Sequence, residues 1–327
     1  MEIVEKYVEQ KDYKNAVEEC INQKLYYLGL YIGTITNQDI TNLKKKKTTR
    51  VKLYCNWCSC EQLFTLWKKM SQGNGIWGNI QIVLDGNIDY YVIINGTSEI
   101  SFDKKKTIIF TMEPNMEKNP NVWGEWSSPE GFLKVFNHKN SYNNLEWHLS
   151  KTYQELIVAK PEKKYDVLST VLSDKYNDPG HVKRVDFIKY LEKKMDVHVY
   201  GNDRWKYKNY KGELPYHCKD DAIFPYKYVF NCENHECKNY FTEKLIDGIL
   251  GECLVFYSGC FNVKQYIDEK AFIYLDLTDF ENDHKIIRKA IEEDWYTQRL
   301  PYILEAKKKI LNELQFFPRL EKFISTL

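Results

Sequence analysis

Residues 228–259 read YVFNCENHECKNYFTEKLIDGILGECLVFYSG. An apolar run ends at Glu233 and Asn234, and a polar stretch follows it. Thr242 and Lys244 then stand at the head of a helix-like apolar segment, after which a second apolar run begins. This order of strand, loop, helix and strand is typical of a unit in a parallel sheet. Polar side chains at the strand end and at the helix start meet at the same edge of such a sheet.

The start of the helix in this unit is the position that needs an explanation. Thr242 is a good N-cap residue, and Lys244 falls in the first turn. A helix N-terminus attracts phosphate and disfavours a cation, because its unpaired N–H groups give it a partial positive charge. Either the neighbouring Glu243 balances Lys244, or a bound anion such as a diphosphate does. The residues alone leave both interpretations open.

Outside this unit, short apolar strands alternate with helix-like segments along the chain. The predicted strands are 51–57, 80–85, 90–95, 107–113, 132–136, 166–173, 197–201, 226–232, 254–259 and 272–277, and the helices predicted between them are 60–70, 182–194 and 242–251. Such alternation predicts parallel sheets with helices on both faces. A polar bridge at about 150–163 separates two such series. We therefore predict an α/β fold of two Rossmann-like lobes with a ligand cleft between them.

The pattern divides the chain into four parts. Residues 1–45 are predicted to be a helical extension with a lysine-rich linker, 46–160 an N-terminal lobe, 161–300 a C-terminal lobe and 301–327 a helical tail. We expect the extension to pack on the main body and not to be a repeat module, since no second copy follows it. Its helices are also a candidate surface for self-association. Pro301 and Pro318 are predicted to break the C-terminal helices.

Composition and charge exclude several classes of protein. The 327 residues contain 47 Lys and Arg against 46 Asp and Glu, a formal net charge of +1. This balance gives no support for nucleic-acid binding. The longest apolar runs are too short to span a bilayer, and the N-terminus is acidic and interrupted by charges. We therefore expect a soluble, cytoplasmic protein without a membrane anchor.

Cysteine usage agrees with an intracellular protein. Nine cysteines are an odd number for a disulfide framework, so reduced thiols are predicted. The spacing of Cys55, Cys58 and Cys60 is the one pattern that suggests zinc. No second pair of ligands follows at a suitable spacing. We favour plain strand cysteines over a structural metal site.

The block that follows the strand end resembles glycosyltransferase family 10, the α1,3/4-fucosyltransferases. The residues that match the family pattern are Glu233, Asn234, Tyr240, Thr242, Glu243, Lys244, Gly251, Val255 and Gly259. The resemblance continues downstream to YIDEKAFIYLDL at 266–277. Upstream, VLSTVLSDKYNDPGHVKRVDFIKYL at 167–191 is similar to a strand ending in Ser-Asn and a helix opened by an arginine. The match covers about 165–280 well and 105–150 loosely, and without an anchor the chain resembles the soluble bacterial and viral members.

The resemblance implies a GT-B architecture and an inverting transfer of fucose from GDP-fucose to a glycan acceptor. It implies that Lys244 and Arg184 hold the diphosphate, that Glu243 binds ribose or sugar hydroxyls, and that Glu233 orients the loop without touching the sugar. The other residues implied at the nucleotide-sugar pocket are Asn234, Tyr240, Thr242, Ser173 and Asp174. The chain departs from the family in having Asp174 after Ser173, and His235 after Asn234.

An inverting transfer also needs a carboxylate that takes the proton of the acceptor hydroxyl. The match to the family's base is Glu113, at the end of the strand TIIFTM, and Glu117 and Glu125 are the alternatives. The sequence contains no Asp-x-Asp triplet, so we expect side chains and a helix end to replace a metal at the diphosphate, with no metal or other cofactor required.

Three functions follow from this reading of the sequence. The first is the transfer of fucose from GDP-fucose to a glycan hydroxyl in an α1,3-type linkage. The second is transfer from another nucleotide sugar by the same fold. The third is a protein of this fold that binds glycan or scaffolds partners without catalysis.

Overall fold

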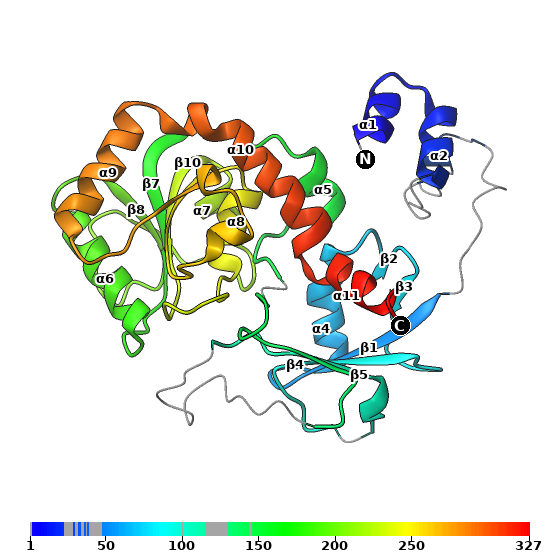
Figure 1. Ribbon diagram of the computed structural model, residues 1–327. Coiled ribbons are helices and arrows are strands. Elements are labelled where there is room, and N and C mark those ends of the chain that lie inside the picture. Colours follow the sequence, from blue (N-terminus) through cyan, green and yellow to red (C-terminus); the bar gives the residue numbers. More distant parts are fainter. Residues whose placement is uncertain are drawn as a thin grey trace.

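The structure is a computed structural model that describes residues 2–22, 48–99, 101–114, 130–143 and 146–327, with isolated positions between 23 and 47. Its α-helices are α1 (Glu2–Glu9), α2 (Tyr13–Asn22), α4 (Cys60–Trp67), α5 (Tyr153–Val158), α6 (Pro179–Leu191), α7 (Asp220–Ile223), α8 (Glu243–Leu250), α9 (Phe280–Glu292), α10 (Trp295–Lys309) and α11 (Phe316–Ile324). Its strands are β1 (Thr49–Cys55), β2 (Ile76–Trp77), β3 (Ile80–Ile82), β4 (Tyr90–Ile94), β5 (Thr107–Phe110), β6 (Lys134–Phe136), β7 (Tyr165–Leu172), β8 (Val197–Gly201), β9 (Tyr210–Gly212), β10 (Tyr226–Cys232), β11 (Leu254–Ser258) and β12 (Phe272–Tyr274). Figure 1 shows two lobes, one around β1, β4 and β5 and one around β7, β8 and β10.

The N-terminal lobe is built on a six-stranded sheet in the order β2-β3-β1-β4-β5-β6. All neighbouring strands pair in parallel except β2 and β3. β5 is buried at every residue, and β4 at its last three, as expected for strands covered on both faces. The predicted parallel sheet is therefore confirmed, with a short antiparallel strand at its edge.

The C-terminal lobe is built on a second six-stranded sheet, in the order β12-β11-β10-β7-β8-β9, and every pair in it is parallel. This is the strand order of a Rossmann fold, in which strands are added first outward from β7 on one side and then, from β10 on, outward on the other. In such sheets ligands bind outside the carboxyl ends of the two strands at the reversal. The predicted fold of two Rossmann-like lobes in a GT-B arrangement is confirmed.

Helices cover both faces of the C-terminal sheet (Figure 1). Phe187 of α6 contacts both Phe230 of β10 and Phe280 of α9, so α6 and α9 share one face. Gly248 of α8 faces Val229 of β10 on the other, and α8 is contacted by α10. The connection 202–225, in which the sequence predicted no helix or strand, also holds β9 and α7.

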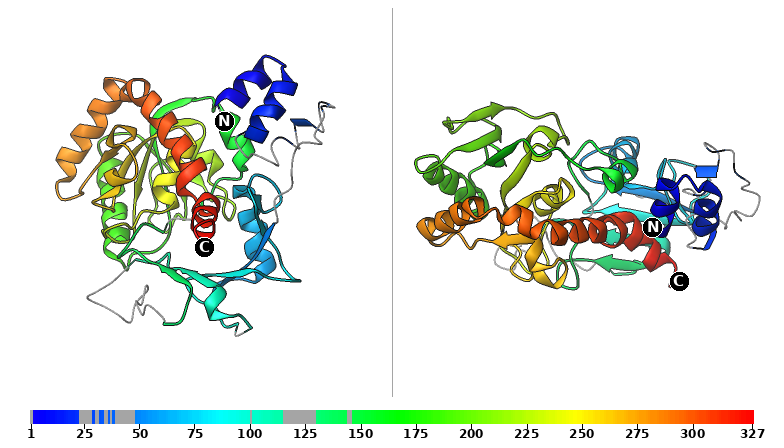
Figure 2. Two further views of the ribbon diagram at one scale, coloured as in Figure 1. Left: turned by 45° about the vertical axis from the view of Figure 1, so that its right-hand side comes forward. Right: turned by 90° about the horizontal axis from the view of Figure 1, so that it is seen from above.

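The C-terminal segment is an integral part of the N-terminal lobe, where the sequence predicted a tail. α10 runs from one lobe toward the other, and α11 ends beside α4 and β2 (Figures 1 and 2). Phe316 packs on Trp67 and Phe110, and Phe317 stacks on Trp77. Both phenylalanines are fully buried, so this segment completes the core of the N-terminal lobe.

The prediction that prolines break the C-terminal helices is wrong. Pro301 lies inside α10, which continues to Lys309 because its buried residues, among them Ile303 and Ala306, hold it against the lobe. Pro318 is the third residue of α11, where its missing N–H has no partner within the helix in any case. The breaks fall at Asp294, which has a left-handed backbone, and at the π-helical turn Ile310–Leu314.

The N-terminal extension is helical as predicted, but its buried residues contact one another and not the core of the lobes. They are Val4, Ala16, Val17, Cys20 and Ile32. The lysine run at 43–47 lies outside the described residues. The nine cysteines, all of them described, form no disulfide in the structure. Among the helices that the structure describes, none has the length and apolarity needed to cross a membrane.

Candidate functional site

Polar side chains lie close together at the carboxyl ends of β7 and β10, where the strand order of the C-terminal sheet reverses. The loops after β7 and β10 meet there with the N-termini of α6 and α8, and they enclose a cavity of about 270 Å³, called here the switch-point cavity. Its lining residues include four cations, Lys175, Arg184, Lys219 and Lys244, and one carboxylate, Glu243. Cations in excess over acids, next to a helix N-terminus, form a site for a polyanion such as a diphosphate.

Arg184 is held in place by both strands at the reversal. Its Nη1 donates to the Cys232 carbonyl at 3.1 Å and to Asn234 Oδ1 at 3.0 Å, and Nη2 lies 3.4 Å from Ser173 Oγ. The residue is 7% exposed, and this burial lowers the pKa of its guanidinium. Nε has no hydrogen-bond partner in the structure. Asn234 and Ser173 thus orient the arginine at the cavity wall.

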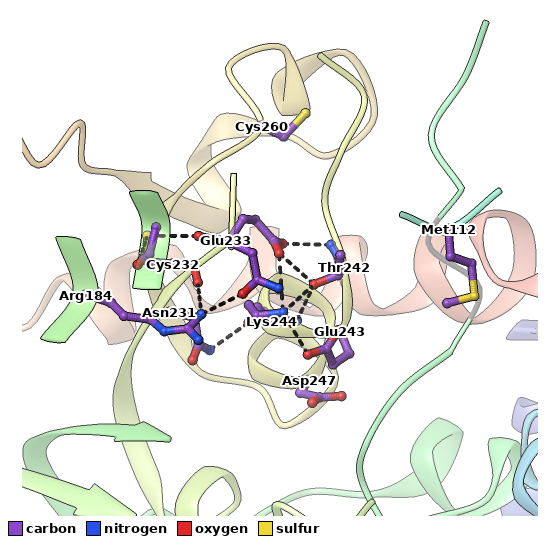
Figure 3. Close-up of polar contacts among 12 residues, drawn as sticks. Met112, Arg184, Asn231, Cys232, Glu233, Thr242, Glu243, Lys244, Asp247 and Cys260 are labelled. Atoms are coloured by element: carbon purple, nitrogen blue, oxygen red, sulfur yellow. Dashed lines mark hydrogen bonds and ion pairs between the residues drawn. The ribbon is translucent and has the colours of Figure 1, made fainter. Parts of the chain in front are cut away.

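Lys244 is the second residue of α8, and two acidic side chains form ion pairs with it. Its Nζ lies 3.1 Å from Glu243 Oε1 and 3.6 Å from Glu233 Oε2 (Figure 3). Thr242 is the N-cap of this helix and accepts a hydrogen bond from the Lys244 backbone N–H. The structure thus shows the ion pair of the first interpretation, in which Glu243 balances Lys244, and the bound anion of the second stays a prediction. Both side chains line the cavity, so an anion there can compete for the ammonium.

Glu233 is buried under the helix start and holds it in position. Its carboxylate accepts hydrogen bonds from the Thr242 backbone N–H at 2.8 Å, from Thr242 Oγ1 at 2.7 Å and from the Tyr257 hydroxyl at 3.2 Å. A β-carbon at Gly259 would lie 2.5 Å from Glu233 Cγ, and φ there is +149°, so the glycine is required by this close approach. With its oxygens occupied, Glu233 orients the loop.

The two acids of this network have opposite pKa shifts. Burial raises the pKa of the Glu233 carboxyl, although Lys244 opposes the shift. Burial acts in the same direction on Glu243, but Lys244, Lys219 and His148 outweigh it and hold the pKa of Glu243 well below its usual range. Glu243 is therefore the ionised acceptor at the cavity wall.

Two further cavities adjoin this site. One of about 390 Å³, the outer cavity, shares Leu172, Ser173 and Lys219 with the switch-point cavity and extends past Asp174 to Gly201. The other, of about 690 Å³, the interlobe cavity, has Glu233 in its wall. The walls of the interlobe cavity come from both lobes, with His138 and Lys139 from the N-terminal one. The switch-point cavity thus shares lining residues with both of its neighbours, Cys232 being the one that it shares with the interlobe cavity.

Glu113 comes to this site from the opposite lobe. It follows the end of β5, where the Met112 N–H donates to Asn95 Oδ1 at 2.7 Å and the Met112 carbonyl lies 3.0 Å from His138 Nε2. Figure 3 shows Met112 across the site from Arg184. Burial raises the pKa of the Glu113 carboxyl, Lys244 lowers it and Glu243 raises it, so all three groups lie within electrostatic reach of one another.

The structure also places the remaining predicted residues. Tyr240 is buried beside the His138 ring, with centroids 5.4 Å apart, and is not among the residues that line the three cavities. Asp174 is exposed and lines the outer cavity only. Glu117 and Glu125 lie outside the described residues.

Two residues that were not predicted from the sequence lie at the site in the structure. Lys219 Nζ lies 2.9 Å from Asp247 Oδ2 and 3.5 Å from Glu243 Oε1 at the cavity wall. His138 joins the lobes, because its Nδ1 lies 3.0 Å from the Asn239 carbonyl and its own carbonyl accepts from Asn239 Nδ2 at 2.6 Å. Neither residue stands in a motif, although His138 lies two residues after a predicted strand.

Comparison with known proteins gives one family. Residues 161–293 match the model of the C-terminal domain of glycosyltransferase family 10 (fucosyltransferase). No curated protein matches the chain. A solved α1,3-fucosyltransferase with GDP is 18% identical, with a TM-score of 0.47 over 82% of this chain and 92% of that one. One with GDP-fucose is 17% identical, with a TM-score of 0.46 over 84% and 93%. WaaG, a glycosyltransferase involved in lipopolysaccharide biosynthesis, is 10% identical, with a TM-score of 0.47 over 84% and 99%.

Proposed function

We propose that the chain is a member of glycosyltransferase family 10, whose C-terminal-domain model its residues 161–293 match, and that it transfers fucose from GDP-fucose to a glycan hydroxyl with inversion at the anomeric carbon. The observation that supports this most is the electrostatic influence of Lys244, from the C-terminal lobe, on the Glu113 carboxyl of the N-terminal lobe. A base and a diphosphate site that face each other across a cleft are what an inverting transfer requires.

The donor would lie along the C-terminal lobe. Its diphosphate fits the switch-point cavity, where Lys244, Arg184 and the N-terminus of α8 balance its charge. The nucleoside fits the outer cavity, which opens beside Ser173 and Asp174. Glu243 can accept hydrogen bonds from a pair of sugar hydroxyls, because its carboxylate is ionised.

The reaction would then proceed as a single displacement. The acceptor hydroxyl gives its proton to the Glu113 carboxylate, and its oxygen forms a bond to the anomeric carbon of the sugar. The bond from that carbon to the β-phosphate oxygen breaks on the opposite face, and its electron pair leaves with GDP. Negative charge grows on the phosphate as this happens, so Lys244 and Arg184 stabilise the transition state more than the ground state.

Cations from side chains make a metal at the diphosphate unnecessary in this proposal. Four of them line the cavity, and the described residues that line it include a single acid, Glu243. A divalent ion needs several carboxylate or carbonyl oxygens in addition to phosphate. The four cationic side chains therefore suit direct binding of the phosphate better than binding of a divalent ion between protein and phosphate.

Nucleotide binding and turnover test the proposal together. The melting temperature is measured with GDP, UDP and CDP, and then with their sugars, because a ligand of the native state raises it by mass action. GDP should stabilise the protein most, and GDP-fucose should be consumed faster when a glycan acceptor is added. A preference for UDP, or turnover of a different nucleotide sugar, would replace the donor. Binding of GDP without turnover of any sugar on a broad panel of acceptors would favour the non-catalytic alternative.

A further inference from the structure

A group of three side chains at the junction of the lobes carries none of the diphosphate-binding or proton-transfer roles proposed above, although two of the three line the outer cavity. Glu146 and His148 lie on the segment that leads to the C-terminal lobe, and His217 precedes α7. One potential ligand atom from each lies within 4.8 Å of those of the other two. We propose that this group, the junction triad, binds a divalent transition-metal ion, with Zn²⁺ the best fit, and so fastens one lobe to the other.

The chemistry and spacing of the triad suit zinc. Two imidazoles and one carboxylate form a common zinc ligand set. His148 Nε2 lies 3.3 Å from Glu146 Oε1, and two ligand atoms about 2.0–2.1 Å from one tetrahedral ion are about 3.3–3.4 Å apart. The rings of His148 and His217 are 4.0 Å apart between centroids and inclined by 60°. A small movement of the His217 side chain is therefore enough to close the set.

The groups around the triad orient its ligands. Trp67 Nε1 donates to Glu146 Oε2 at 2.9 Å and leaves Oε1 for His148. The backbone of His148 is held on both sides, since its N–H donates to Asp247 Oδ1 at 2.8 Å and its carbonyl accepts from the Lys219 N–H at 2.8 Å. Hydrogen bonds of this kind to the carboxylate and the backbone fix the direction of metal ligands.

His217 is positioned by a strained turn. Its φ is +53°, a left-handed conformation that is unfavourable for a residue with a β-carbon. The turn is closed by the Cys218 N–H, which donates to the Pro215 carbonyl at 3.1 Å. Beyond it, Asp220 accepts hydrogen bonds from the backbone and side chain of Ser150. The two segments that supply the ligands are therefore joined on both sides of the triad.

The surroundings leave room for a cation and a fourth ligand. The nearby amines are already compensated, because Lys219 pairs with Asp247 and Glu243, and Lys244 pairs with Glu243. His148 and His217 both line the outer cavity, so a fourth position on the ion faces that cavity and can be filled by water. The Lys219 side chain pairs with Glu243, which makes the triad a neighbour of the switch-point cavity and not part of it.

Metal titration tests the site without any assay of transfer. Protein made without a histidine tag is stripped with chelator and titrated with Co²⁺, followed by its visible absorption, and then with Zn²⁺ in competition. Wild type should bind one equivalent and gain melting temperature with Zn²⁺. His148→Ala and His217→Ala should each lose more than about a hundredfold in affinity, since even changes behind the ligands cost 10–100-fold. Glu146→Gln should lose affinity while it keeps the hydrogen bond from Trp67.

Two controls separate the triad from other metal ligands. His198→Gln alters a histidine that contacts Tyr226 at the opposite, amino end of the C-terminal sheet, and it should bind as wild type does. Cys58→Ser tests the thiols near Glu146, and it too should leave the titration unchanged. Absence of binding in wild type, equal affinity in His217→Ala, or a thiolate charge-transfer band that vanishes in Cys58→Ser would each overturn the proposal. Melting of each stripped variant shows that it is folded before metal is added.

Discussion

The Lys244 ammonium lies 3.6 Å from the carboxylate of Glu233, a residue only 1% exposed. A carboxylate at such depth is stable in its charged form only when a cation or several hydrogen bonds compensate it. Thr242 and Tyr257 supply hydrogen bonds, and Lys244 supplies the opposite charge. The side chain proposed to hold the diphosphate therefore also stabilises the loop that presents it.

Lys244→Ala should destabilise the protein in the absence of nucleotide. We expect the free energy of unfolding, measured in urea, to fall by about 2–3 kcal/mol, the low end for breaking a buried pair because Lys244 is partly exposed. Adding Glu233→Gln should restore most of that stability, since the unpaired charge is gone, while binding of GDP stays weak. Equal stability of Lys244→Ala and wild type would show that the ion pair has no structural role.

Arg184→Ala should weaken GDP binding by about 1.5–3 kcal/mol, the usual contribution of a charge-assisted hydrogen bond. Arg184→Lys keeps the charge but not the fork that contacts Cys232 and Asn234, so we expect it to recover only part of the loss. Calorimetric titration measures both. Lys189 lies in the last turn of the same helix, α6, and does not line the switch-point cavity. Lys189→Ala is therefore the matched control and should bind GDP as wild type does.

Phe316→Ala should destabilise the N-terminal lobe although it changes the other end of the chain. Its ring is fully buried against Trp67 and Phe110. Loss of a buried phenylalanine costs about 3–5 kcal/mol in unfolding free energy. Leu327→Ala, at an exposed position, should change stability little. A small effect of Phe316→Ala would mean that α11 is not part of this core.

The sequence predicted both sheets and the switch point because their signals are local. Apolar runs such as 226–232 mark buried parallel strands, and Thr242 caps the helix where its side chain predicts. The position of Glu113 near Lys244 was predicted only through the resemblance. It depends on how two lobes meet, and no short-range pattern records that.

The failures share a physical cause. Pro301 was predicted to break the helix because proline lacks the N–H that a helix interior needs. Packing of the helix around it outweighs that one missing hydrogen bond. The role of Phe316 in the other lobe, and the bond of His138 to Asn239, are contacts between residues far apart in the chain. Lys219 likewise acquires its acids only when α7 and α8 come together.

Transfer should not require a divalent ion at the diphosphate. The assay uses His217→Ala, which lacks the metal site proposed at the junction, so that chelation can act only elsewhere. We expect GDP-fucose turnover by this variant to be the same with EDTA as without it. Loss of turnover in EDTA that Mn²⁺ restores would show that a metal, and not side chains alone, balances the diphosphate. Loss of turnover in EDTA by wild type, but not by His217→Ala, would mean that removal of a metal from the junction triad causes the loss.

Glu113→Gln tests the base. The amide keeps the size of the carboxyl but cannot take a proton, so turnover with acceptor should fall by about two to four orders of magnitude. GDP affinity and melting temperature should hardly change, because the donor site is on the other lobe. Glu117→Gln and Glu125→Gln in the same assay test the two alternatives, and loss of turnover in one of them alone would move the base there.

The pH dependence gives Glu113 a second signature. A base must be ionised, so kcat falls as the pH drops through its pKa, and burial raises the pKa of the Glu113 carboxyl from its ordinary value. The acid limb of the profile should therefore lie at higher pH than for an exposed carboxylate. Lys175 is one of the cations that lower this pKa. Lys175→Ala, assayed at saturating donor, should move the limb to still higher pH, whereas an unmoved limb would mean that another group titrates.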